Sequence, residues 1–301
     1  MEAKAVSVQS YRGITAVQFF TSDIDTFDYM PLGKAAEQNF IKLKEINEGG
    51  SVNDVFVINS SDKYVFMMDG DIIIGAKQNR IINTSVLLPP KSKSSIHVSC
   101  VEQGRWSNGG GSFKPSDYTA PSSMRMNKNK DVFTNLRSGN EHYADQNRVW
   151  ESVSENLRDM KVESKTDSLD DVIKEKKEEF DLFADKFSIS ENCNGIALFH
   201  GGDFIGLDLF NSSEVYKEYF PKIIKGIIWE LTGKWHTAED TKESEFKYRT
   251  LEMIDKIESQ EKNKFKGAGV GEEERFDDQA LSGFKLNYQN KLIHLAAFKS
   301  N

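Results

Sequence analysis

The residues whose types could support chemistry are concentrated between Gly75 and Trp106. Two strand-like runs, 81–88 and 95–101, flank the turn-forming segment 89–94, which indicates a β-hairpin. Pairing back from this turn brings polar residues of both strands to the open end of the hairpin, termed here the hairpin mouth. The mouth then combines amides, guanidinium groups and a carboxylate that could bind a phosphate or carboxylate ligand. These residues are Gln78, Asn79, Arg80, Glu102 and Arg105.

Strand alternation predicts that the acid and one arginine of the hairpin mouth point toward the interior. Glu102 shares its strand face with Ile96 and Val98, and Arg80 shares its face with Ile82. We therefore expect a half-buried contact between Arg80 and Glu102. Such a contact is either a structural ion pair or part of a ligand pocket, and both interpretations stay open. In a reacting pocket, Glu102 is the candidate general acid or base and the arginines stabilise negative charge.

Two further residues of this stretch have alternative roles. Cys100 is a nucleophile only if a neighbouring arginine lowers the pKa of its thiol, and a small buried residue is the favoured interpretation. Trp106 either stacks on a ligand ring or fills the end of the sheet, and the sequence favours neither.

Recognised metal and phosphate-loop motifs are not found. The glycines at 109–111 lack the Lys-Ser/Thr ending of a phosphate loop, and those at 267–271 follow a predicted helix rather than a strand. We interpret both as flexible connectors, so no metal site is predicted and no cofactor can be named. The histidines show no recognised zinc spacing: His97, His142, His200, His236 and His294.

Composition predicts a globular protein with a substantial core. The chain has 301 residues, of which 38% are hydrophobic and 29% are charged. Its formal charge of -8 argues against a protein that binds nucleic acid through the phosphates. No apolar run approaches the roughly 20 residues needed to cross a bilayer. The two cysteines and the absence of a secretory apolar segment predict a reduced, cytoplasmic setting.

The elements that must position the hairpin mouth are predicted to be mostly antiparallel strands in the first half of the chain. A helix is expected at 32–46, and 107–140 is rich in Gly, Ser, Asn and Lys, which predicts a loop or lid. Helices and strands then alternate in blocks, which favours an α+β fold over a doubly wound one. We expect a β-rich part at 1–140, of sheet or sandwich type, and a helical and mixed part at 141–301 packed on it as one unit. Besides the hairpin, strands are predicted at 13–20, 52–59, 64–68, 72–74, 196–199, 204–210, 280–288 and 292–298, and helices at 141–160, from 168 to about 187, 214–231 and 241–264.

The stretches GAKQNRIINTSVLLPP and VSCVEQGRW resemble the signature of the ARG and rhodanese-phosphatase-superfamily-associated protein domain, a bacterial family. The family is named for neighbouring genes, among them those of ADP-ribosylglycohydrolases. The resemblance therefore implies a link to ADP-ribose or related nucleotide metabolism, although it names no reaction. By motif position it adds Arg125, Gln146, Arg275 and His294 as candidate ligand-binding residues, with Trp150 available for a base.

Three functions are compatible with these observations. The first is a protein that binds or processes a phosphorylated nucleotide, such as an ADP-ribose derivative, at the hairpin mouth. The second is a non-catalytic module that binds a partner protein through the Phe-rich helices and the 107–140 segment. The third is a nucleotide sensor without turnover. Catalysis is left open, and a small anionic ligand is the expected partner.

Overall fold

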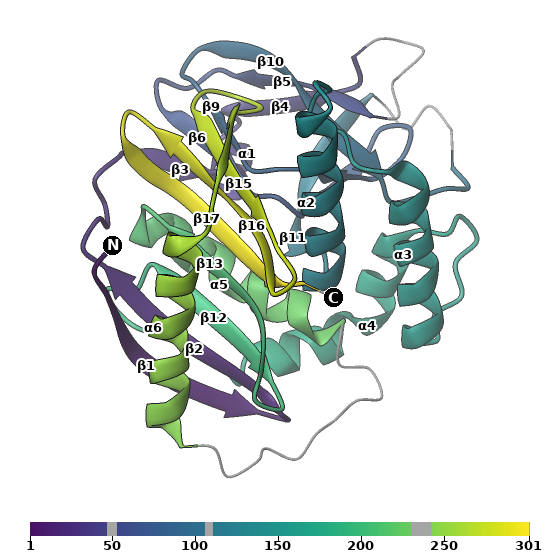
Figure 1. Ribbon diagram of the computed structural model, residues 1–301. Helices are drawn as coiled ribbons and strands as arrows, with labels where there is room; N and C mark the ends of the chain where they lie inside the picture. The colour runs from purple at the N-terminus through teal and green to yellow at the C-terminus, as the bar shows by residue number, and fades with distance from the viewer. Residues whose placement is uncertain (47–52, 106–110, 230–241, 301) are drawn as a thin grey trace.

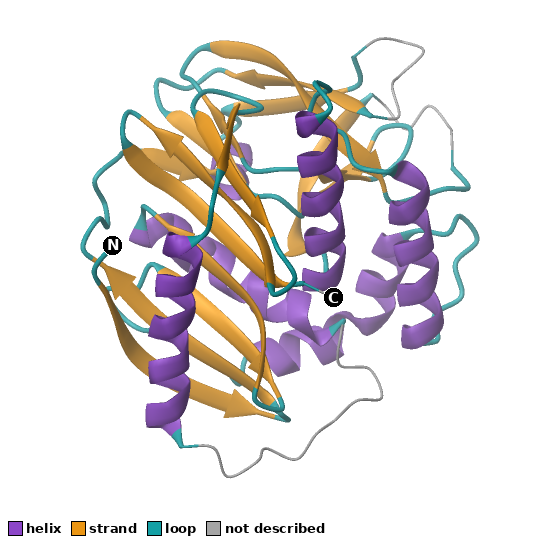
Figure 2. Cartoon of the chain, viewed as in Figure 1, coloured by secondary structure: helices purple, strands orange, loops and turns teal. Residues whose placement is uncertain are grey.

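The computed structural model describes residues 1–46, 53–105, 111–229 and 242–300, and it shows an α+β fold built on antiparallel sheets (Figure 1). Within these residues the strands form an eight-stranded sheet, a closed six-stranded barrel and a three-stranded sheet. Helices pack against these sheets and fill the space between them (Figure 2).

The eight-stranded sheet draws strands from both sides of residue 140, and all its pairs are antiparallel. In spatial order it runs β1 (Ala3–Tyr11), β2 (Ile14–Thr21), β12 (Gly195–His200), β13 (Asp203–Phe210), β17 (Lys291–Lys299), β16 (Leu281–Tyr288), β15 (Glu272–Asp277) and β14 (Asn263–Lys266). Helix α6 (Glu243–Ser259) covers part of one face, where Phe246 and Ile254 pack with Phe199.

The barrel closes around apolar side chains that alternate along its strands. In β5, for example, Val55 and Val57 point into the barrel core and their neighbours are more exposed. In spatial order the barrel comprises β10 (Ser92–Cys100), β5 (Asp54–Asn59), β4 (Ile41–Lys44), β11 (Ser112–Thr119), β7 (Asp71–Gly75) and β8 (Arg80–Ile82).

The three-stranded sheet joins the barrel to the rest of the core. It contains β3 (Tyr29–Pro31), β6 (Tyr64–Met67) and β9 (Val86–Leu88), with β3 parallel to β6. Val65 and Val86 belong to the barrel core, whereas Phe66 and Leu87 belong to the larger core beneath the eight-stranded sheet. One small sheet is therefore buried on both faces.

The remaining helices begin at residues suited to that position. The N-cap side chains of Asp145, Ser168 and Ser212 accept hydrogen bonds from the first turns of α3, α4 and α5. In chain order these helices are α1 (Leu32–Glu37), α2 (Ser122–Arg137), α3 (Gln146–Met160), α4 (Leu169–Ala184) and α5 (Ser213–Ile228), the last with Pro221 inside it.

The structure confirms most of the predicted strands and corrects four local predictions. The helix expected at 32–46 ends at Glu37, and its second half is strand β4. The run 81–88 is not one strand, because β8 joins the barrel and β9 joins the three-stranded sheet. Strand β9 pairs with β6 and the start of β10 pairs with β5, so the hairpin predicted around 89–94 is not formed. The glycines at 267–271 follow strand β14 rather than a helix. Strands β1, β3, β14 and β15 were not predicted.

The fourth correction concerns the segment 107–140, which is not a loop over its described part. It contains β11 and the sixteen-residue helix α2. The helix escapes a search for an apolar stripe because several of its buried side chains are polar. Arg125, Lys128 and Asn129 are each at most 2% exposed.

One of these polar residues, Arg125, is the centre of a buried hydrogen-bonded network. Its guanidinium contacts the carboxylates of Asp69 at 2.9 and 3.0 Å and of Asp208 at 2.6 and 2.9 Å. His294 Nε2 lies 3.2 Å from Asp208, and His294 Nδ1 lies 2.9 Å from Ser85 Oγ. Burial raises the pKa of Asp208, but Arg125 and His294 outweigh burial and hold that pKa below its ordinary value.

We predict that Arg125→Met lowers the free energy of unfolding by about 3–5 kcal/mol, because it leaves two buried carboxylates without their cation. The pKa of Asp208 is lowered in the folded state, so its contribution is present above the ordinary value of 3.8 and is lost as the pH falls through and below it. Urea unfolding at pH 7 and pH 3 measures both effects. The exposed control Arg158→Met should change stability by less than about 0.5 kcal/mol. Equal stability of the wild type and Arg125→Met at pH 7 would refute the prediction.

Candidate functional site

The structure brings the two strand ends of the predicted hairpin mouth together. Strand β8 pairs with β10 so that Arg80 lies opposite Cys100. Beyond the paired residues, Val101 N donates to Asn79 O at 3.0 Å, and Asn79 N donates to Glu102 Oε2 at 3.1 Å. The neighbourhood expected from the sequence is therefore present, although the register differs by about three residues from simple pairing around the turn.

The carboxylate of Glu102 forms its ion pair with Arg105. Arg105 Nε donates to Oε1 at 2.8 Å and Nη2 donates to Oε2 at 2.6 Å. Arg105 Nη1 also donates to Ala76 O at 2.7 Å, and Thr166 Oγ1 donates to Glu102 Oε1 at 3.0 Å. Burial raises the pKa of Glu102, but the hydrogen bonds from Arg105 and Asn79 hold it below its ordinary value.

Arg80 lies beneath this pair and is fully buried. Its Nη1 donates to Gln78 Oε1 at 3.3 Å, and its Nη2 lies 4.0 Å from Glu45 Oε1. Burial lowers the pKa of the Arg80 guanidinium. The expected inward orientation of Arg80 and Glu102 is present, while the carboxylate that was expected to pair with Arg80 is bound bidentately by Arg105. Of these charged groups only Arg105, with 26% of its side chain exposed, reaches the surface to a notable extent.

Two further candidates lie next to the mouth. Gln146 holds the backbone of Cys100, since its Oε1 accepts from Cys100 N at 2.8 Å and its Nε2 donates to Cys100 O at 2.9 Å. Cys100 is fully buried, its Sγ donates to Glu102 O at 3.0 Å, and burial raises the pKa of its thiol. The predicted residue Trp106 lies outside the described residues.

The other predicted residues lie in separate buried clusters. Arg125 and His294 belong to the network described above. Arg275 lies in a second cluster, where it binds Glu273 Oε2 at 2.7 Å and Thr84 Oγ1 at 2.6 Å. Asp69, Asp208 and His294 are close enough to share a metal ion, but Arg125 already binds both carboxylates.

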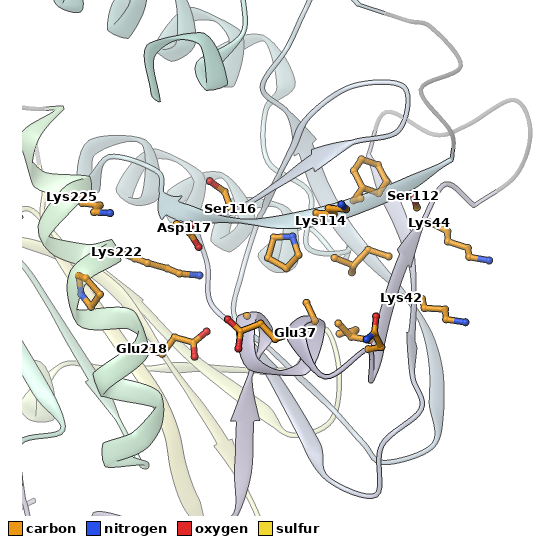
Figure 3. Close-up of a pocket in the computed structure, with 18 residues that line it drawn as sticks. Glu37, Lys42, Lys44, Ser112, Lys114, Ser116, Asp117, Glu218, Lys222 and Lys225 are labelled. Carbon is orange, nitrogen blue, oxygen red and sulfur yellow. The ribbon is translucent and has the colours of Figure 1, made fainter. Parts of the chain in front are cut away.

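A pocket that the sequence analysis did not predict lies between the barrel and α5 (Figure 3). Its volume is about 880 Å³. Five lysines and three acidic residues line it, so its walls carry a basic excess. The charged residues are Lys42, Lys44, Lys114, Lys222, Lys225, Glu37, Asp117 and Glu218, and the apolar ones include Ile41, Leu43, Phe113, Pro115 and Pro221.

Lys222 is the unusual member of this pocket. It is only 6% exposed, and Figure 3 shows its side chain extended from α5 into the pocket. Among the described residues its ammonium forms no hydrogen bond or ion pair, although Nζ lies 5.3 Å from the centre of the Tyr219 ring. Lys225, one turn further along α5, instead pairs with Asp181 at 2.6 Å. Buried ammonium groups are normally paired, so Lys222 is poised for an anion.

Helical spacing is the sequence signal that could have identified the α5 side of this pocket. Glu218, Lys222 and Lys225 are four and three residues apart, which places them on one face of α5. The sequence contains no indication that β4 and β11 of the barrel face this helix, because strand β11 lies in the segment interpreted as a loop.

Comparison with known proteins identifies the family of nearly the whole chain. The model of the ARG and Rhodanese-Phosphatase-superfamily-associated Protein domain matches residues 2–298. The chain belongs to this family. No curated protein and no solved structure matches the chain. The family name describes an association with ARG and with the rhodanese-phosphatase superfamily. Among the described residues, no helix has the length and apolar character to cross a membrane.

We predict that Glu102→Gln lowers the free energy of unfolding at pH 7 by about 1–3 kcal/mol, because it removes the charge that Arg105 binds. The pKa of Glu102 is lowered in the folded state, so its contribution is present above the ordinary value of 4.5 and is lost as the pH falls below it. The stabilities of wild type and variant should therefore converge in acid. Urea unfolding at pH 7, 5 and 3.5 tests this, with exposed Glu155→Gln as control. A constant difference at all three values would contradict it.

Proposed function

We propose that this protein binds a phosphorylated small molecule of the nucleotide class in the lysine-lined pocket between α5 and the barrel. The observation that carries the proposal is the buried ammonium of Lys222, which points into the pocket and has no acceptor among the described residues. A phosphate oxygen is the ligand group that would satisfy it, through a charge-assisted hydrogen bond.

The remaining pocket walls fit the rest of a nucleotide. A volume of about 880 Å³ falls within the range of small-molecule sites, and the basic excess of the walls attracts a polyanion. Pro115 of β11 and Pro221 of α5 line the pocket and are not buried in the core. These surfaces can pack against a flat base while Lys42, Lys44 and Lys114 remain near its phosphates. Family membership supports an ADP-ribose-related ligand by association.

We predict that Lys222→Gln weakens binding of ADP-ribose or ADP at least tenfold, because the substitution removes the only buried cation of the pocket that is not already paired in the described structure. Isothermal titration calorimetry with ADP-ribose, ADP, AMP and adenosine measures this. Adenosine should bind more weakly than ADP, and ADP binding should weaken as salt rises.

The matched control is Lys217→Gln, which removes an exposed lysine from the same helix outside the pocket. It should leave the affinity for ADP within a factor of two of the wild type. Equal losses in both variants would mean that net charge, and not the pocket, governs binding. No binding of any phosphorylated compound by the wild type would overturn the proposed function.

A second candidate is the hairpin mouth, and the partly exposed guanidinium of Arg105 favours it. There a ligand phosphate would replace Glu102 as the partner of Arg105, with Gln78, Asn79 and Arg80 around it. We predict that, if the mouth is the site, Arg105→Gln abolishes the shift in melting temperature caused by ADP-ribose, while exposed Arg158→Gln retains it. An unchanged shift in Arg105→Gln, combined with a lost shift in Lys222→Gln, would assign the ligand to the lysine-lined pocket.

A further inference from the structure

Two carboxylates face each other beside Lys222 at the α5 end of the pocket. Glu218 comes from α5 and Glu37 from the last turn of α1, and Figure 3 shows their carboxylates pointing toward one another. Glu37 is exposed and Glu218 is half-buried. A site that only bound phosphate would not be expected to place two acids next to its buried lysine, because like charges repel.

The position of Glu218 is set by close packing against α1. A Cβ added at Gly33 would overlap Glu218 Oε1 and would lie 3.9 Å from Lys222 Nζ. The backbone N–H of Lys34 donates a hydrogen bond to the same carboxylate. Burial raises the pKa of Glu218, Lys222 opposes this effect, and Asp71 and Glu37 add to it. The glycine therefore leaves room for the Glu218 carboxylate in this corner of the pocket.

A buried carboxylate of the protein interior attracts the ammonium group of Lys222. Asp71 is 1% exposed, and its carboxylate contributes an electrostatic attraction with Lys222. That carboxylate is itself fixed, because Tyr219 OH donates to Asp71 Oδ2 at 2.7 Å and Met68 N donates to the same oxygen at 2.8 Å. The ammonium, which extends into the pocket, is therefore also attracted by a fixed carboxylate of the protein interior. It can bind a phosphate without a rearrangement of α5.

We propose that this corner binds the sugar phosphate part of the ligand, with the phosphate on Lys222 and vicinal hydroxyls on Glu37 and Glu218. The inference rests on the proposed function and narrows its ligand to phosphorylated compounds that carry a diol. Carboxylate oxygens accept hydrogen bonds from adjacent sugar hydroxyls, as acidic residues do for ribose in dinucleotide sites. The acids repel a phosphate that lacks hydroxyls, so the corner favours sugar phosphates over inorganic phosphate.

The test compares inorganic phosphate, ribose 5-phosphate and 2-deoxyribose 5-phosphate by calorimetry on the full chain. We expect wild type to bind ribose 5-phosphate at least tenfold more tightly than inorganic phosphate, and the deoxy compound about threefold to tenfold more weakly than ribose 5-phosphate. Glu218→Gln should weaken ribose 5-phosphate and leave inorganic phosphate unchanged or tighter, so that the ratio of the two affinities falls at least threefold.

The controls separate this inference from folding and from the proposed function. Glu155→Gln, which removes an exposed acid far from the pocket lining, should keep the wild-type ratio. The folded state raises the pKa of Glu218, so the ionised carboxylate lowers the stability of the protein at pH values above that raised pKa. This loss of stability disappears as the pH falls through the raised pKa and Glu218 becomes protonated. Glu218→Gln should therefore melt at or above the wild-type temperature at pH 7.

Two outcomes would overturn the inference. In the first, ADP binding depends on Lys222, but the ratio of the affinities for ribose 5-phosphate and inorganic phosphate is the same in wild type and Glu218→Gln. The carboxylates then do not bind hydroxyls, while the proposed function still holds. If no phosphorylated probe binds at all, the inference and the proposed function both fail. Gly33→Ala provides a second variant, since its methyl group displaces Glu218 and should lower the same ratio.

Discussion

The double ion pair of Arg125 is the interaction on which the arrangement of the large sheet and the barrel depends. Its guanidinium binds Asp69, in the turn before barrel strand β7, and Asp208, in strand β13 of the eight-stranded sheet. Helix α2 can lie between the two only because both carboxylates neutralise the buried arginine. Asp71 follows Asp69 by two residues in the same turn, and its carboxylate attracts Lys222 electrostatically. The interior network and the pocket are thus joined through one turn.

The stretch between β8 and β9 supplies buried polar side chains to the interior. Three consecutive residues there each contact a different element. Asn83 Nδ2 donates to His142 O, Thr84 Oγ1 donates to Glu273, and Ser85 Oγ lies 2.9 Å from His294 Nδ1. A buried polar group must find its partner, so the identity of each of these residues is constrained by geometry as strictly as by any reaction. The distinctive sequence of the stretch is therefore consistent with a structural role.

The sequence predicted those parts of the fold where periodicity and burial agree. Strand alternation correctly placed Arg80 and Glu102 on inward faces, and the cap at Ser168 correctly marked the start of α4. It failed where buried residues are polar: α2 was interpreted as a loop, and the charged strand β15 was not recognised. The sequence also did not determine the ion-pair partner of Glu102. Two arginines are within reach of its carboxylate, and only the folded chain shows that Arg105 binds it. The lysine-lined pocket could not be foreseen, since its walls come from elements that are far apart in sequence.

The contrast between the mouth and the pocket indicates where a ligand is more readily accommodated. At the mouth, Arg105 already satisfies a buried carboxylate, so an anion would have to leave Glu102 buried without its cation, which costs several kcal/mol. In the pocket, Lys222 is 6% exposed and forms no ion pair among the described residues. An anion there adds a partner for the ammonium and breaks none of the described pairs. This energetic asymmetry, more than the count of charges, favours the proposed site beside α5 over the mouth.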